Sequence, residues 1–220
     1  TAARSAASAS RMAVLSTRGV SQVVQTGRVR PDPSEIVPIE PDTKDWTWTL
    51  QRECPDCGFD AQRLDVAELP QLLRDHALAW GELLSRPGVT ERPASDVWSP
   101  LEYACHVRDV HRRFDERVGL MLHEVDPEFA NWDQDATAVA EDYYHQDPAT
   151  VALELVAAAG TVAGRYAAVT GDQWARRGRR SDGSEFTVES ISRYHAHDMV
   201  HHAHDVGLDV TRGGASGTGA

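Results

Sequence analysis

Apolar side chains in four stretches of the chain recur every three or four residues, which is the spacing of one face of an α-helix. The pattern predicts four helices, over residues 66–85, 100–122, 148–169 and 187–207. The second has the clearest start signal, because Ser99 can cap the helix, Pro100 fits its first turn, and Glu102 completes a capping box. Proline or glycine follows the end of each stretch and marks where the helix stops.

The segments that connect these helices differ in length and character. Residues 126–147 form a long acidic and aromatic connection, whereas residues 176–184 are basic and contain glycine, which predicts a loop or a hairpin. Ahead of the first helix, Trp46 and Trp48 alternate with threonines, a pattern typical of a short extended segment. Four long helices with a long middle connection predict an all-α fold, a four-helix bundle with a crossover connection.

The two ends of the chain differ from the predicted bundle, which occupies residues 41–210. Residues 1–40 are rich in Ala, Ser and Arg, and they carry no acid before Asp32. This composition predicts a disordered basic tail, since it buries too little apolar surface to offset the entropy of ordering. An Arg- and Ser-rich start also fits a transit peptide. Residues 211–220, rich in Gly, Ser and Thr, predict a flexible C-terminal tail.

Composition and charge exclude several classes of protein. The chain of 220 residues has a net charge of −12, which repels nucleic-acid phosphates and anionic lipid headgroups. No apolar run is long enough to span a bilayer, so we expect no membrane partner. Three cysteines are too few for a secreted disulfide framework. We therefore expect a cytoplasmic protein whose partner is a small molecule.

Histidines are concentrated in the last predicted helix, where five lie between residues 195 and 204. His197 and His201 are four residues apart, so their imidazoles lie on one helix face and can bind one metal ion. The alternative is a solvated histidine-rich surface. A complete site needs a third ligand from another helix. The spacing leaves four candidates open: His76, His106, His111 and His123.

A second group of metal-binding residue types precedes the first helix, in the sequence Cys54-Pro-Asp-Cys57-Gly58. Two cysteines at this spacing are found in zinc knuckles, in redox pairs and in simple tight turns. A structural metal site would need further ligands. The candidates are Cys105, His202 and His204. Cys105 itself is otherwise interpreted as a packed thiol.

Several charged residues near the histidines have two interpretations. Asp109, Asp198 and Asp205 can orient metal ligands, or they are ordinary helix-surface acids. Arg193 can bind a substrate carboxylate, or it forms a common salt bridge. The acidic stretch 131–135 can hold a second cation, or it is a solvated loop.

Two motifs of this chain resemble those of the DinB-like proteins. Trp98-Ser99 followed by His106 and Asp109 resembles the family's second-helix signature, and His197-Asp198-x-x-His201 resembles its fourth-helix motif. The resemblance covers residues 46–207. The family includes mycothiol-dependent maleylpyruvate isomerases and bacillithiol transferases. The resemblance implies an up-down-down-up bundle with a metal, commonly zinc or nickel, held by His106, His197 and His201.

The resemblance and the histidine pattern together predict a metal-dependent enzyme, a thiol-dependent transferase or isomerase that acts on a small molecule. Zinc is the expected metal, although nickel and iron also suit imidazole ligands. A low-molecular-weight thiol is the expected second cofactor. The alternatives are a metal-dependent hydrolase, which needs no thiol, and a non-catalytic metal- or ligand-binding stress protein. Packing through helix faces would also allow a homodimer.

Overall fold

Four long helices form the centre of the fold. The structure, a computed structural model, describes residue 39 and residues 44–208, which belong to one compact unit, Val37–Ala220. The predicted tails at 1–40 and 211–220 lie outside the described residues, apart from residue 39. The long helices are α1 (Leu69–Leu84), α2 (Pro100–His123), α4 (Pro148–Ala167) and α5 (Val188–Asp205). All four predicted helices are confirmed, with ends that differ by up to three residues.

Helix α2 starts where the sequence predicts. The Ser99 side chain accepts a hydrogen bond from the Glu102 backbone at 3.2 Å, and the Glu102 side chain accepts one from the Ser99 backbone at 2.9 Å. This reciprocal cap satisfies two of the amide groups that the first helical turn leaves without partners. It fixes the start of the helix that carries His106.

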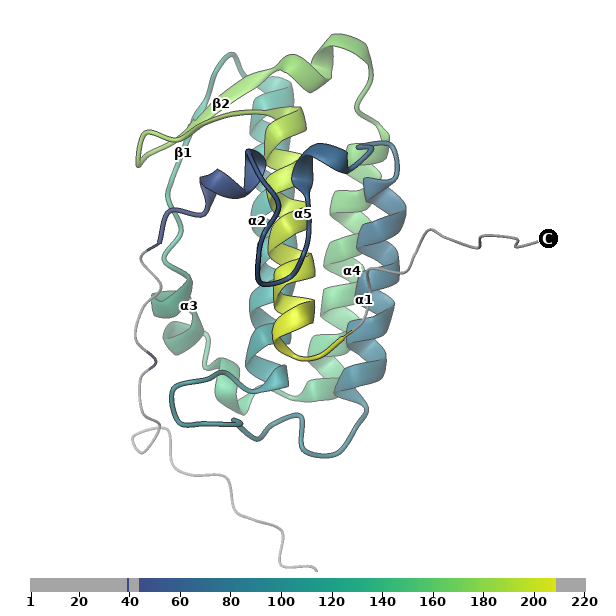
Figure 1. Ribbon diagram of the computed structural model, residues 1–220, viewed down its shortest axis with the longest axis vertical. Coiled ribbons are helices and arrows are strands. Elements are labelled where there is room, and N and C mark those ends of the chain that lie inside the picture. Colours follow the sequence, from purple (N-terminus) through teal and green to yellow (C-terminus); the bar gives the residue numbers. More distant parts are fainter. Residues whose placement is uncertain (1–38, 40–43, 209–220) are drawn as a thin grey trace, which may run out of the picture. The chain divides into compact units, whose positions relative to one another are not determined.

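The helix directions follow from which residues meet. Arg108 and Asp115 of α2 pair with Glu154 and Arg165 of α4, so these two helices run parallel. Helix α5 runs antiparallel to α2, since His106 meets Asp198 and His111 meets His195, and α1 runs antiparallel to α2 and α4 (Figure 1). The order up-down-down-up, with a crossover after α2, agrees with the prediction.

The crossover and the hairpin before α5 form a small sheet at one end of the bundle (Figure 1). Strand β1 (Glu128–Phe129) pairs in parallel with β2 (Arg177–Arg180), which pairs antiparallel with β3 (Glu185–Thr187). The sequence leaves a loop or a hairpin open for residues 176–184, and the structure has a hairpin. Strand β2 needs Gly178, because a Cβ atom there would lie 2.7 Å from Met121 Cγ of α2.

The crossover also contains two short helices that the sequence pattern did not predict. They are α3 (Gln134–Ala140) and the 3₁₀ helix η4 (Tyr143–His145), which precedes α4. Asp133 caps α3 by accepting a hydrogen bond from the Ala136 backbone. The acidic stretch 131–135 therefore includes a helix cap, and it contributes to no metal-ligand cluster among the described residues.

The segment before α1 differs from its prediction. Instead of an extended segment, residues Thr47–Leu50 form a 3₁₀ helix, η2, and residues Ala61–Arg63 form another, η3. Asp45 explains the difference, because its carboxylate accepts hydrogen bonds from both the backbone and the hydroxyl of Thr47. Such local bonds favour a turn over an extended strand. A further short 3₁₀ helix, η5 (Gly171–Ala175), follows α4.

Apolar contacts hold the four helices together in two groups. Near the sheet, Leu73, Val118, Val162 and Met199 come from all four helices and are fully buried. Towards the other end, Trp80, Leu101 and Leu155 come from α1, α2 and α4. Within the described part of the chain, none of the helices is long and apolar enough to cross a membrane.

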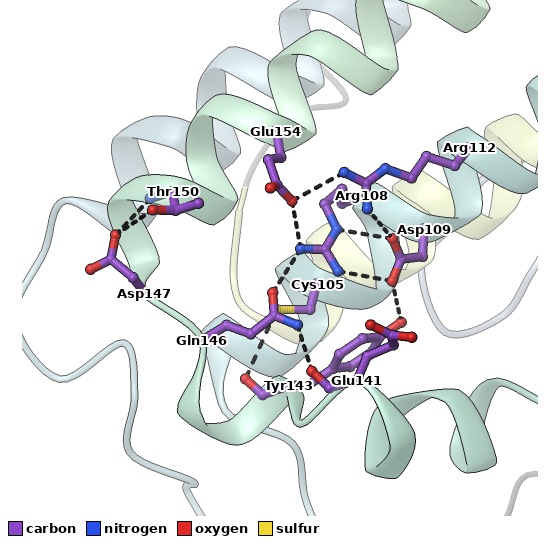
Figure 2. Close-up of polar contacts among 10 residues, drawn as sticks. All are labelled: Cys105, Arg108, Asp109, Arg112, Glu141, Tyr143, Gln146, Asp147, Thr150 and Glu154. Atoms are coloured by element: carbon purple, nitrogen blue, oxygen red, sulfur yellow. Dashed lines mark hydrogen bonds and ion pairs between the residues drawn. The ribbon is translucent and has the colours of Figure 1, made fainter.

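A buried polar network connects α2, the crossover and α4 (Figure 2). The Arg108 guanidinium donates two hydrogen bonds to Asp109 and one each to Gln146 and Glu154, at 2.7–2.9 Å. Asp109 also accepts from the Tyr143 hydroxyl at 2.6 Å. Because each charged group has several partners, the network compensates for the cost of removing it from water.

We expect Arg108→Met to lower the free energy of unfolding by about 3 kcal/mol or more, because it leaves Asp109 and Glu154 without their buried cation. The side chain of Arg108 is only 5% exposed. Urea unfolding measures the change. The control is Arg63→Ala, whose side chain is 83% exposed and should contribute less than about 1 kcal/mol. Equal losses in the two variants would contradict a stabilising role for the network.

Candidate metal centre

Helix α5 carries two overlapping pairs of metal-binding residue types. His197 and His201 form one pair, and Asp198 and His202 form the other. Each pair spans four residues and occupies one stripe of the helix, but successive residues differ by about 100° around the axis. The two pairs therefore face different neighbours. The structure places each pair in a separate cluster of potential ligands.

The first cluster, here called the inner cluster, consists of His106, Asp198 and His202. Asp198 Oδ1 lies 3.7 Å from His106 Nε2 and 3.6 Å from His202 Nε2. These distances are too long for hydrogen bonds. They are close to the separation of about 3.4 Å between nitrogen and oxygen ligands of one tetrahedral zinc ion, given metal–ligand bonds of about 2.0–2.2 Å.

Three atoms of the inner cluster are buried without hydrogen bonds. They are His106 Nδ1, His106 Nε2 and Asp198 Oδ1, which have no hydrogen-bond partner among the described residues. A buried polar atom without a partner is costly, so native proteins rarely keep one without a reason. A cation between His106 Nε2 and Asp198 Oδ1 would remove that cost for these two atoms. The donor set therefore fits a divalent metal ion.

Neighbouring side chains orient the inner ligands. His202 Nδ1 lies 3.0 Å from Asp205 Oδ2, and a hydrogen bond donated there leaves the lone pair of Nε2 directed at the cluster. The Trp132 ring stacks on His106, with centroids 5.3 Å apart and planes 3° apart. Trp98 contacts the same imidazole at 5.5 Å. These contacts restrict the ligands before any ion binds.

Burial sets the protonation of the inner ligands. It lowers the pKa of His106, which favours the neutral imidazole that a metal requires. Burial alone would raise the pKa of Asp198, but His106 and His202 outweigh it and hold that pKa well below its usual range. At neutral pH the cluster thus presents a neutral imidazole and a carboxylate.

The second cluster, here called the loop cluster, consists of Cys54, Cys57, His197 and His201. Cys54 Sγ lies 3.7 Å from His201 Nδ1. His197 Nε2 is buried and has no hydrogen-bond partner among the described residues. The two cysteines come from the turn before α1, so this cluster joins that turn to α5.

The three predicted metal ligands lie in two clusters. His106 is in the inner cluster, whereas His197 and His201 are in the loop cluster. Asp198, predicted to orient ligands, is a candidate ligand itself. The signal for the inner pair is present in the sequence, since Asp198 and His202 have the same spacing as His197 and His201. Periodicity alone does not decide which stripe faces α2.

The other candidates for a third ligand lie away from both clusters. His111 is fully buried, and its Nδ1 lies 3.0 Å from His195 Nε2. His76 is buried in α1, and His123 contacts a carbonyl oxygen at the end of α2. Cys105 is a buried thiol, as predicted, and burial raises its pKa to about 12. Among the described residues, these four belong to no metal-ligand cluster.

Two predicted site residues have structural partners instead. Arg193 Nη1 donates to the carbonyl oxygens of Ala61 and Leu64, so its guanidinium holds the segment before α1 rather than a substrate. Asp109 accepts from Arg108 and Tyr143 within the buried network (Figure 2). Neither is among the described residues that line the cavity near the metal clusters.

A cavity of about 320 Å³ opens beside both clusters. Its walls include Asp198 and His202 of the inner cluster and aromatic rings from Trp46, Trp98 and Tyr103. It also has a marked charge imbalance. The described lining residues include one lysine, Lys44, and five acids: Asp56, Asp96, Asp135, Asp198 and Asp205. This volume lies in the range of small-molecule sites.

Comparisons with known proteins agree with the fold. A family model described as the DinB superfamily matches residues 71–206. The fold is also similar to the solved structure of YfiT from Bacillus subtilis, described as a probable metal-dependent hydrolase with an unusual four-helix bundle topology. That likeness has a TM-score of 0.58 and 21% identity, and it covers 65% of this chain and 85% of YfiT. No curated protein matches the chain.

Burial of His76 should make the stability of the protein depend on pH. Burial lowers its pKa to about 4, so between pH 4 and 6.5 the unfolded chain binds one more proton than the folded chain at this residue. Stability should therefore fall as the pH falls through this window, by up to about 1.4 kcal/mol per pH unit from His76. We expect His76→Met to show a shallower slope in urea unfolding at several pH values. Leu73→Met, a conservative core change on the same helix, should keep the wild-type slope. Parallel curves for all three proteins would contradict the effect.

Proposed function

The chain belongs to the DinB superfamily, and from this premise we propose that it is a metal-dependent enzyme acting on a small molecule at the inner cluster. One observation supports this most directly. Two imidazole nitrogens and a buried carboxylate oxygen face one another at distances too long for hydrogen bonds, beside a cavity. Three protein ligands next to an accessible space are typical of catalytic metal sites rather than closed structural ones.

His106, Asp198 and His202 would hold the ion. A divalent ion bound there lowers the pKa of a water or thiol and polarises a carbonyl group. Asp205 orients His202, and Trp132 and Trp98 hold the His106 ring. Zinc is the proposed metal, since two imidazoles and one carboxylate are a common zinc set, although nickel and iron accept the same ligands.

Tyr103 is the residue of the cavity wall best suited to contact a substrate. Its ring packs on His202 with centroids 5.4 Å apart. Burial raises its pKa to about 12, so the phenol stays protonated at neutral pH and can donate a hydrogen bond to a substrate oxygen.

The acidic wall indicates the substrate class. Asp198 would be occupied by the ion, and the four other carboxylates of the wall, against one lysine, favour a neutral or positively charged molecule over an anion. Two reactions suit the inner cluster. One is the thiol-dependent transfer or isomerisation that the family resemblance implies. The other is hydrolysis, which is supported by the description of YfiT as a probable metal-dependent hydrolase.

We expect His202→Ala to bind about one ion fewer per chain than the wild type and to lose more than about 100-fold in turnover, because it removes a ligand. His204→Ala is the matched control, since His204 is exposed on the same helix and belongs to neither cluster. Elemental analysis gives the metal content. If His202→Ala keeps its metal while His197→Ala loses activity, the set His106, His197 and His201 would be the catalytic one instead.

Thiol dependence separates the two reactions. We expect turnover of neutral or cationic electrophiles to require an added low-molecular-weight thiol such as mycothiol, and to stop when a chelator removes the metal. Turnover of esters or amides without any thiol would instead assign a hydrolase. Metal binding without rate enhancement, either with the electrophiles and thiol or with the esters and amides, would support the non-catalytic alternative.

A further inference from the structure

We propose that Cys54, Cys57, His197 and His201 form a second, structural zinc site that joins the turn before α1 to helix α5. This site is distinct from the inner cluster and shares no ligand with it. It includes two thiols, and it joins the turn before α1 to α5, whereas the inner cluster joins α2 to α5. The proposal rests on geometry and does not depend on which reaction the inner cluster performs.

The turn from Cys54 to Phe59 has the backbone of a metal-binding knuckle. The Cys54 amide donates to the Phe59 carbonyl oxygen at 2.9 Å, and the Gly58 amide donates to the Cys54 carbonyl oxygen at 2.8 Å. Gly58 has a φ of +72°, a conformation that residues with a Cβ rarely adopt. The tight turn brings both sulfur atoms to one side, within 4.8 Å of each other and of the two histidines.

Helix α5 supplies the other half of the site. The rings of His197 and His201 lie one helical turn apart, with centroids 5.2 Å from each other. The separation of 3.7 Å between Cys54 Sγ and His201 Nδ1 is close to the value of about 3.5 Å expected for two ligands of one tetrahedral zinc, from Zn–S of about 2.3 Å and Zn–N of about 2.0–2.1 Å. A zinc ion would also give His197 Nε2 the partner that it lacks among the described residues.

The donor set and its burial indicate a structural role. Two cysteines and two histidines fill all four positions of a tetrahedral zinc, which leaves none for water or substrate. Cys54 is fully buried and His197 is 3% exposed. A redox pair is the alternative for Cys54 and Cys57, but a disulfide there would leave His197 Nε2 without a partner. The histidine pair therefore favours a metal over a disulfide.

The site would fix one wall of the cavity. The segment that it holds contributes Lys44, Trp46 and Asp56 to the lining. Trp46 lies on the two histidine rings, at 5.0 Å from His201 and 5.9 Å from His197. The part of the segment nearest to α1 is held separately, by the hydrogen bonds that Arg193 donates to the carbonyl oxygens of Ala61 and Leu64. Zinc would thus complete the attachment of a segment that has little other secondary structure.

Cobalt is the probe that distinguishes the two sites. We expect the full chain, loaded with Co²⁺, to show the near-ultraviolet absorption of a cobalt–thiolate bond. Cys57→Ser should lose this band and about one ion per chain, whereas His202→Ala should lose one ion and keep the band. Cys105→Ser is the matched control, because Cys105 is buried outside both clusters and should change neither. Absence of the band from the wild type, or its loss in Cys105→Ser but not in Cys57→Ser, would overturn the proposal.

A second measurement uses the wild type alone and stays informative if Cys57→Ser does not fold. Arg52 and Arg63 are exposed on either side of the turn and are sites for trypsin. Removal of zinc should raise the rate of cleavage there by about 10-fold or more, because the segment opens more often, and added zinc should restore protection. Unchanged cleavage would overturn the structural role. Mass analysis showing a Cys54–Cys57 disulfide in the protein as purified, without zinc, would favour the redox alternative.

Discussion

The rotational setting of helix α5 determines the chemistry of both clusters. Adjacent residues on a helix point about 100° apart, so His197 and Asp198 must face different neighbours. The setting is fixed by apolar residues of the same helix, of which Ile191, Ala196 and Met199 are fully buried in the core. With those three facing the bundle centre, the stripe of Asp198 faces α2 and the stripe of His197 faces the segment before α1. Core packing therefore decides which cluster each of these residues of α5 joins.

Asp205 connects the two clusters. Its Oδ2 pairs with His202 Nδ1 at 3.0 Å, and its Oδ1 lies 3.9 Å from His201 Nε2. Two divalent ions bound close together would repel each other strongly in a partly buried region. Asp205, Asp198 and the nearby Asp56 place negative charge around both positions and reduce that repulsion. If both proposed sites bind metal, the acidic cavity wall would compensate the charge of the ions as well as favour a neutral or cationic substrate.

The sequence predicted the features that depend on local periodicity and local chemistry. Helix α2 was predicted from its cap at Ser99 and its apolar spacing, and the bundle followed from the number and length of such helices. Strand β1 and helix α3 were missed because two and seven residues are too few to establish a period. The alternation of Trp46 and Trp48 with threonines favours an extended segment, but the hydrogen bonds between Asp45 and Thr47 favour a turn, and alternation alone does not reveal them.

The candidate site was predictable in residue type but not in grouping. His106 and the α5 histidines were identified from spacing and resemblance, yet the partners of Cys54 and Cys57 lie about 140 residues away in the sequence. Only the packing of the turn on α5 brings them together. Local spacing also gives His197/His201 and Asp198/His202 equal weight, since both pairs span one turn. The choice between them depends on long-range contacts, which no local pattern contains.

A carboxylate in the inner cluster has chemical consequences that three histidines would not have. With Asp198 as a ligand, a bound divalent ion and its ligands would together carry one positive charge instead of two. This favours retention of the ion in a site that is largely removed from water, where an uncompensated charge is costly. It also weakens the attraction of the site for anions, as the acidic cavity wall does. Asp198 belongs both to the ligand set and to the wall, so the proposed preference for a neutral or cationic molecule would depend on the other four acids of the wall, Asp56, Asp96, Asp135 and Asp205.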